Sequence, residues 1–160
     1  MRGSIGKRAG GLVVIADSLW IFADEVYADL VFEGVHVTAR EVLADYTKRP
    51  NDRLITIHSL SKSFALAGLR LGYVHAPANV VASARRVGVH TSFNVPTVLQ
   101  RAGLAALQTG GPWLEQAKAM YASHRAEARE ALKHAGLRAY TGEGATYFFV
   151  DFRDVLRGRP

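Results

Sequence analysis

One lysine in this chain lies among the kinds of side chain that can hold an anionic aldehyde. Ser59-Leu60-Ser61-Lys62 sets the amine among two hydroxyls, and the segment 67–73 adds Arg70 two helical turns downstream. An amine forms a carbon–nitrogen bond with an aldehyde, whereas hydroxyls and a planar guanidinium bind a phosphate. These residue types at this spacing point to covalent binding of a phosphorylated aldehyde cofactor.

A carboxylate and a phenol follow an apolar run earlier in the chain. Residues 19–23 are continuously apolar and rich in aromatics, which predicts a strand buried on both faces of a parallel sheet, with Asp24 and Tyr27 just beyond its end. Residues 54–58 predict a second strand, which delivers Lys62 at its end. Open α/β sheets bind ligands at this edge, so we expect the polar groups to meet there. Each of them taken singly is explained as an ordinary surface or strand-end residue, so the prediction rests on their combination.

The remaining pattern predicts a layered α/β arrangement. The expected elements are an apolar run at 11–16, a helix over 38–43 with Thr38 as N-cap, a strand over 72–76, helices over 79–87, 96–107 and 113–135, the last ended by Gly136, and strand character over 146–150. We interpret residues 1–121 as one unit. Residues 122–160 then form a linking helix and the beginning of a second, smaller unit.

The composition is that of a globular protein and excludes several classes of site. The apolar fraction is 49%, there is no cysteine, and the six histidines are scattered, so we predict neither disulfides nor a metal site. The net charge is +6, but the basic residues are dispersed and many stand beside acids, which favours solvated helix faces over nucleic-acid binding. No apolar segment approaches the length of a membrane span, and the first residues lack the apolar region of a secretory signal. We therefore expect a cytoplasmic protein without membrane contact.

The chain resembles the class I/II aminotransferases, the fold-type I pyridoxal-phosphate-dependent enzymes, in three segments that occur in the family's order. These are 23–30 (the D-E-x-Y segment), 59–64 (S-x-S-K) and 67–73 (G-x-R-x-G-Y). Segments 91–100 and 144–151 are similar to family segments as well. The resemblance covers nearly all the chain from Asp17 onward. It implies an α/β fold: part of the three-layer large domain of the aspartate aminotransferase-like fold, with the start of the small domain.

The resemblance also implies roles for the residues around the lysine. Lys62 would form the Schiff base with the aldehyde of pyridoxal 5'-phosphate and would then move the substrate Cα proton as general base and acid. Asp24 would pair with the ring nitrogen and keep it protonated. Tyr27 would donate its phenol to the 3-oxygen of the ring.

Phosphate binding and the reaction are implied in the same way. Ser59 and Arg70 would bind the phosphate, and Ser61 would either assist or cap the following short helix. The implied reaction transfers an amino group between an amino acid and a 2-oxo acid, in a homodimeric parent. Two alternatives stay open: a carbon–sulfur β-lyase or β-replacement enzyme of the same fold, and a non-catalytic remnant.

Several family elements do not occur in the sequence. We find no phosphate-holding loop, no ring-stacking aromatic, and no arginine in the pattern that pairs with the substrate carboxylate. Residues 4–7 resemble the N-P-x-G segment, but Gly3 stands where its asparagine would fall. We therefore expect an incomplete segment of the enzyme, whose 160 residues alone bind the cofactor weakly at best and do not transaminate.

Overall fold

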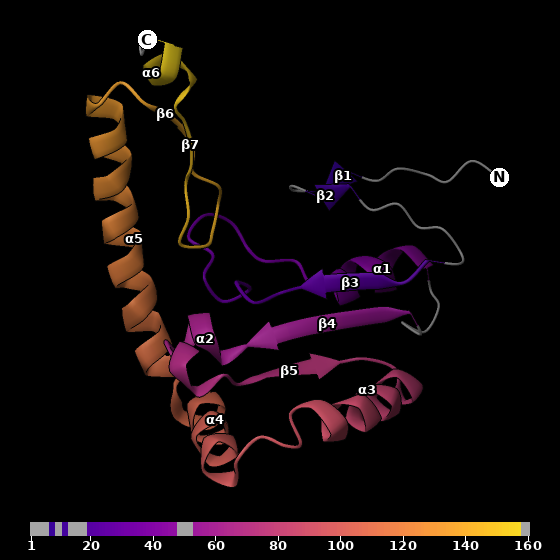
Figure 1. The fold of residues 1–160 in the computed structure, drawn as a ribbon. Coiled ribbons are helices and arrows are strands. Elements are labelled where there is room, and N and C mark those ends of the chain that lie inside the picture. Colours follow the sequence, from indigo (N-terminus) through magenta and orange to yellow (C-terminus); the bar gives the residue numbers. More distant parts are fainter. Residues whose placement is uncertain (1–6, 9–10, 13–18, 48–52, 158–160) are drawn as a thin grey trace, which may run out of the picture.

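The computed structural model describes residues 7–8, 11–12, 19–47 and 53–157, which form an α/β arrangement with a mixed sheet (Figure 1). In chain order the elements are β1 (Lys7–Arg8), β2 (Gly11–Leu12), β3 (Ile21–Asp24), α1 (Ala39–Thr47), β4 (Leu54–Ser59), α2 (Leu60–Ser63), the 3-10 turn η1 (Ala67–Leu69), β5 (Gly72–His75), α3 (Ala78–Thr91), α4 (Thr97–Thr109), α5 (Gly111–His134), β6 (Arg138–Tyr140), β7 (Phe149–Asp151) and α6 (Arg153–Arg157). Most of the expected apolar run at 11–16, and of the segment 4–7, lies outside the described residues.

A three-stranded sheet in the order β3-β4-β5 carries the predicted strand ends. β3 runs parallel to β4, with Asp24 opposite Ile57. β5 runs antiparallel to β4, with Gly72 opposite Ser59, so the sheet is mixed; the sequence had predicted no direction for this strand. The 12 residues from Leu60 to Leu71 include the short helices α2 and η1. They turn the chain back beside β4, and they do not form the longer crossover connection that a parallel neighbour requires.

Close backbone approach fixes the pairing of β4 with β5. A Cβ on Gly72 would lie 2.5 Å from the carbonyl oxygen of His58, closer than real Cβ contacts. Only glycine allows the two strands to meet at this point. β5 thus starts at Gly72, where the strand expected over 72–76 begins.

The helices agree with the sequence pattern in kind and differ at their ends. α1 begins with a capping box at Thr38: the Thr38 Oγ1 accepts from the Glu41 amide at 3.1 Å, and the Glu41 carboxylate accepts from the Thr38 amide at 2.8 Å. α5 ends as predicted, with Gly136 at φ +68° and its amide on the Lys133 carbonyl at 3.0 Å. α3 continues four residues beyond the expected end at Val87, to Thr91. Among the described helices none is long and apolar enough to cross a bilayer.

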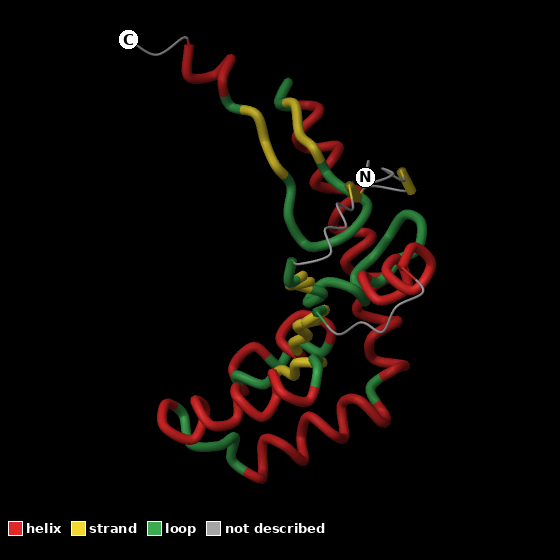
Figure 2. The backbone as a smooth tube through the Cα atoms, turned by 90° about the vertical axis from the view of Figure 1, so that its right-hand side faces the viewer, coloured by secondary structure: helices red, strands yellow, loops and turns green. Residues whose placement is uncertain are grey.

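The hairpin β6–β7 lies at the far end of α5 from the three-stranded sheet, as the two views in Figures 1 and 2 agree. Strand character was expected over 146–150, but β7 begins only at Phe149. The preceding loop is bent, with Gly142 and Ala145 both at φ +61°. It returns to the segment after β3, where Val31 and Gly144 form an isolated antiparallel bridge.

The buried core is small, and one strand departs from its expected environment. The buried apolar side chains are Leu30, Leu43, Leu54, Ile55, Leu60 and Ala117. β3 was expected to be buried on both faces, yet Phe22 is 68% exposed, and all four residues of β5 are exposed. Burial of a central strand on both faces requires packed layers on each side. The described residues leave part of this sheet uncovered.

Candidate functional site

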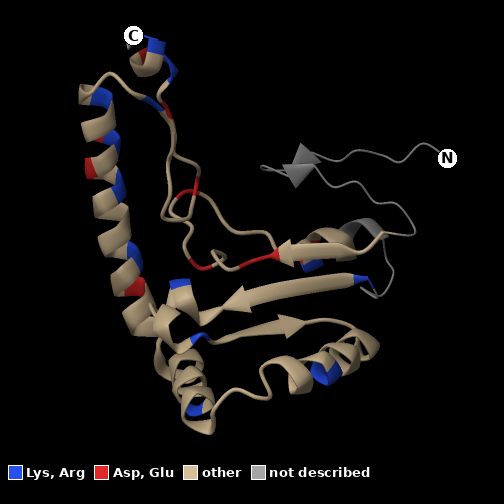
Figure 3. Cartoon of the chain, viewed as in Figure 1, with Lys and Arg blue, Asp and Glu red and all other residues tan. Residues whose placement is uncertain are grey.

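The two predicted strand ends lie at one edge of the sheet. Since β3 and β4 are parallel, Asp24 at the end of β3 and Ser59 at the end of β4 share the carboxyl edge. Figure 3 shows an acidic stretch directly after β3 and a basic position on α2 beside it. The two acids that end β3 and follow it have different surroundings and partners. Asp24 is exposed and its Oδ1 accepts from the Val26 amide at 3.3 Å, whereas Glu25 is buried and accepts from the Ala39 amide at 2.9 Å, at the start of α1.

Lys62 lies on α2, which starts from the end of β4. The Ser59 hydroxyl is the N-cap of this helix and accepts from the Ser61 amide at 3.1 Å. Capping therefore belongs to Ser59 and not to Ser61, for which the sequence allowed it. The buried Ser63 donates to Asp29 Oδ2 at 2.7 Å and so ties the helix to the segment after β3. These contacts fix the short helix that carries the amine.

The structure brings Lys62 and Tyr27 together and adds a second phenol. The Lys62 Nζ lies 5.7 Å from the centroid of the Tyr27 ring, within the range of a cation–π contact. The Tyr27 hydroxyl donates to the hydroxyl of Tyr147. The two rings meet edge to face, with centroids 5.5 Å apart. The amine thus has two phenols as its polar neighbours.

The three groups shift one another's acidity. Hydrogen bonding to the Tyr27 phenol, with a smaller contribution from Tyr147, raises the pKa of the Lys62 amine. The hydrogen bond from Tyr27 and the positive charge of Lys62 lower the pKa of the Tyr147 phenol. Burial, followed by the hydrogen bond to Tyr147, raises the pKa of Tyr27. A protonated Lys62 is therefore favoured by both phenols, and its amine becomes a nucleophile only when that proton leaves.

Arg70 stands at the end of η1 in a constrained conformation. Its φ of 52° is left-handed, which is uncommon outside glycine and is found disproportionately at functional sites. Its Nη1 donates to the Ala67 carbonyl at 3.1 Å, and the side chain is otherwise exposed. A guanidinium has five N–H donors, so most of them stay available to a ligand. The assignment of Arg70 and Ser59 to a phosphate remains a prediction, as does the pairing of Asp24 with a ring nitrogen.

Tyr147 is the site residue that sequence reasoning missed. It is 120 positions away from Tyr27 and belongs to a segment that the sequence linked only to the start of a second unit. The available signal was its position within 144–151, one of the segments similar to the family. Nothing in residue spacing shows that this loop returns to the segment after β3, because the return is made by backbone hydrogen bonds.

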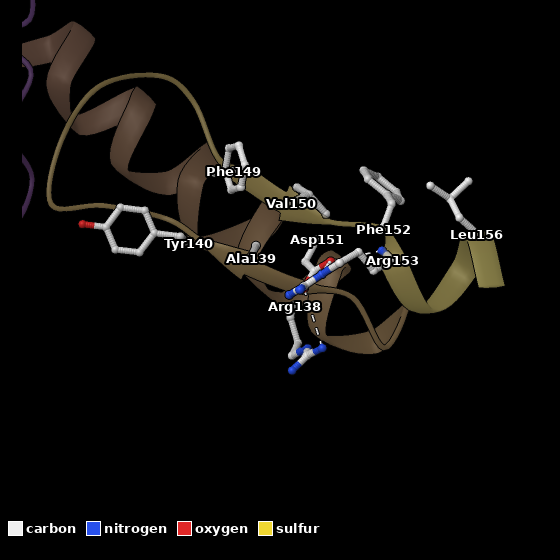
Figure 4. A pocket seen from close by; sticks show the side chains of 9 residues that line it. All are labelled: Arg138, Ala139, Tyr140, Phe149, Val150, Asp151, Phe152, Arg153 and Leu156. Atoms are coloured by element: carbon white, nitrogen blue, oxygen red, sulfur yellow. Dashed lines mark hydrogen bonds and ion pairs between the residues drawn. The ribbon is translucent and has the colours of Figure 1, made fainter.

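A separate open pocket of about 580 Å³ lies between β6, β7 and α6 (Figure 4). It is lined by Arg138, Ala139, Tyr140, Phe149, Val150, Asp151, Phe152, Arg153 and Leu156. The Arg153 guanidinium lies 2.7 Å from Asp151 Oδ2, and this contact holds the pKa of that carboxyl well below its usual range. The pocket is at the opposite end of α5 from α2, so it is not part of the lysine site.

The fold is that of a known family. A family model described as "Aminotransferase class I and II" matches residues 12–157. The chain therefore belongs to the class I and II aminotransferases, and its fold is the fold-type I architecture of aspartate aminotransferases.

Particular relatives give the extent of the similarity. The chain is 34% identical over 140 residues to the arginine–pyruvate transaminase AruH of Pseudomonas aeruginosa. The aligned residues cover 87% of this chain and 34% of that protein. It is 30% identical over 145 residues to the aspartate aminotransferase of Thermotoga maritima, covering 89% of this chain and 36% of that protein. The structure of Thermus thermophilus aspartate aminotransferase with maleate superimposes with a TM-score of 0.78 at 27% identity, covering 86% of this chain and 35% of that one. The chain thus spans about a third of the length of these relatives.

Proposed function

We propose that the protein containing this chain is a pyridoxal-phosphate-dependent aminotransferase that moves an amino group between an amino acid and a 2-oxo acid. The observation that carries the proposal is the position of Lys62 at the carboxyl edge of the sheet, with its amine beside the phenols of Tyr27 and Tyr147. The relatives support it, since those named above are a transaminase and aminotransferases. No feature of the described residues favours β-elimination or β-replacement over amino transfer.

The residues of the site fit the chemistry of this cofactor. Pyridoxal phosphate carries an aldehyde, a phenolic oxygen, a ring nitrogen and a phosphate. Against these the chain offers an amine at Lys62, a phenol at Tyr27, a carboxylate at Asp24, and donors at Ser59 and Arg70. The Ser59 oxygen already accepts from an amide, but its own O–H proton stays available.

Each residue then has a definable task. When bound, the cofactor supplies an aldehyde for covalent attachment and a ring that accepts electrons from the substrate. The Lys62 amine would hold the cofactor covalently and would remove and return the proton at the substrate Cα. Asp24 would hold the proton on the ring nitrogen, and Tyr27 would donate to the ring oxygen in place of Tyr147, to which its hydroxyl donates in this structure. Ser59 and Arg70 hold the phosphate by charge-assisted hydrogen bonds.

The two phenols also regulate the proton that Lys62 must lose. The raised pKa of its amine means that the free base is scarce near neutral pH. Tyr27 already donates its own proton to Tyr147, so the two neutral phenols hold the charged amine through their oxygens and do not take its proton.

The proposal names a class of substrate rather than one amino acid. Relatives are named for arginine and pyruvate, aspartate and prephenate, and aromatic amino acids, which differ in charge and size. We propose a homodimer for the whole protein by analogy with the family.

The test is covalent trapping on the protein as its gene encodes it. Pyridoxal phosphate is added, the sample is reduced with borohydride, and the modified peptide is identified by mass spectrometry. We expect one adduct on Lys62, none after Lys62→Ala, and an unchanged adduct after Lys118→Ala, a lysine on α5 that pairs with Glu115. Formation of a 2-oxo acid together with aminated cofactor identifies amino transfer, whereas release of ammonia identifies elimination. An adduct on another lysine, or none in the unmodified protein, would refute the proposal.

A further inference from the structure

Tyr147 reaches the lysine site from a loop far away in the sequence. Its hydroxyl accepts a hydrogen bond from the Tyr27 hydroxyl, and the two rings meet at 75° with centroids 5.5 Å apart. Tyr147 is 60% exposed, so burial of its ring does not account for this position. The contact therefore depends on what holds the loop before β7.

A buried arginine on α5 holds that loop by its carbonyl groups. Arg125 is only 7% exposed, and its two terminal nitrogens donate to four backbone oxygens at 2.8 to 3.3 Å. The acceptors are Thr141, Gly142, Gly144 and Ala145. The planar guanidinium also lies over the rings of Phe32 and Phe148, 4.8 and 5.0 Å from their centroids. We call this group of contacts the Arg125 clamp.

The segment after Tyr27 fixes the same loop from the other side. The Ala145 amide donates to the Leu30 carbonyl at 2.8 Å, and the Phe32 amide donates to the Glu143 carbonyl at 2.9 Å. A Cβ on Gly144 would lie 2.7 Å from the Leu30 carbonyl oxygen, so the two backbones meet as closely as glycine permits. The loop is thus held between α5 and the segment that carries Tyr27. The last residue held in this way is Ala145, two positions before Tyr147.

We propose that Tyr147 is a positioning residue of the lysine site, which holds the Tyr27 phenol beside the Lys62 amine, and that the Arg125 clamp fixes the loop that delivers it. The inference rests on the proposed function for its use of Lys62. It adds to that function Tyr147, from the loop before β7, and the Arg125 clamp that places this loop.

The expected effect on Lys62 has a definite sign. The titratable groups that act on its amine are the phenols of Tyr27, from the segment after β3, and Tyr147, from the loop before β7; both raise its pKa. The nearby carboxylate of Asp29, on the segment after β3, accepts the hydrogen bond that Ser63 of α2 donates. Removing the Tyr147 hydroxyl takes away one contribution that favours the charged amine. The pKa of Lys62 should then fall, and free amine should be present at lower pH.

The experiment measures attachment of pyridoxal phosphate to the cofactor-free protein, expressed as its gene encodes it, as a function of pH. The rate is followed by visible absorbance, and the site is verified by borohydride reduction and mass spectrometry. Tyr147→Phe keeps the ring and removes only the hydroxyl. Tyr140→Phe is the matched control, since Tyr140 is 76% exposed on β6 and lies outside the site. Arg125→Lys and the double variant complete the set.

We expect Tyr147→Phe to retain the adduct on Lys62 with the pH midpoint of the attachment rate shifted downward, and Tyr140→Phe to keep the original midpoint. Arg125→Lys should shift the midpoint in the same direction, and should add nothing in the Tyr147→Phe background. An unchanged midpoint in Tyr147→Phe overturns the role of Tyr147, whereas additive shifts overturn the role of the clamp. Absence of the Lys62 adduct in the unmodified protein refutes instead the proposed function. If Arg125→Lys does not fold, Tyr147→Phe alone decides.

Discussion

Replacement of Arg125 by lysine tests how much the clamp contributes to stability. The guanidinium makes four hydrogen bonds from two nitrogens, whereas an ammonium has three donors on one atom and cannot span the same carbonyls. Each terminal nitrogen of Arg125 serves two carbonyls, and the single nitrogen of lysine can replace only one of them, so at least two hydrogen bonds should be lost. A hydrogen bond to a charged group contributes roughly 1.5–3 kcal/mol, so the lower end of that range predicts a loss of about 3 kcal/mol in the free energy of unfolding. Loss of stacking on Phe32 and Phe148 acts in the same direction.

Urea denaturation measures the global loss, and amide hydrogen exchange locates it. Protection should fall at the amides of Phe32 and Ala145, which pair the loop with the segment after β3, while the β3–β4 ladder keeps its protection. Arg129→Lys is the matched control on the same helix. Arg129 pairs with Glu33 at 2.6 Å and reaches the Gly142 carbonyl of the same loop only at 3.5 Å, with its side chain 37% exposed, so its replacement should cost no more than about 1 kcal/mol.

Equal effects of the two substitutions would refute this reasoning. So would a large loss in Arg125→Lys that is spread evenly over all amides, because the clamp acts between one loop and one segment. In that case Arg125 would contribute by general burial on α5 and not by holding the loop.

Two further predictions concern the elements around the site. Gly72→Ala places a Cβ against the His58 carbonyl and should destabilise the β4–β5 pairing by about 1–3 kcal/mol, whereas Gly68→Ala, with open space at its Cβ, should stay within about 0.5 kcal/mol; equal unfolding midpoints in urea would contradict this. Hydrogen bonds from Thr38, its backbone amide first, lower the pKa of Glu41, so the stabilisation by this carboxylate is present above the pKa of an unfolded glutamate and is lost as pH falls through the lower, folded value. The difference in unfolding free energy between the protein and Glu41→Gln should therefore vanish in acid, and a difference that persists there would count against the capping box.

Local patterns were enough to predict most of the elements. The capping box at Thr38 and the glycine at 136 set helix ends through contacts within a few residues, and both are present in the structure. The direction of β5 could not be predicted in this way. It depends on whether the chain between Leu60 and Leu71 turns back or crosses over, which is a property of the whole connection.

The lysine site was predicted only in part. Lys62 and Tyr27 each follow a strand end, and two parallel neighbouring strands place their ends at the same edge, so their proximity follows from sequence. Tyr147 follows no such rule. Its loop is bent just before the segment where strand character was expected, because Arg125 and the segment 30–33 each bind different backbone groups of the loop.

The sequence by itself thus determined the family and the helix ends at Thr38 and Gly136, and it singled out Lys62, because each is written in residues that are close together in the chain. The tertiary structure decided which phenol partners Tyr27 and which loop carries it. These contacts join residues about 20 to 120 positions apart. A buried guanidinium satisfies several carbonyls at once only after α5, the loop and the segment after β3 have come together, and no local pattern encodes that meeting.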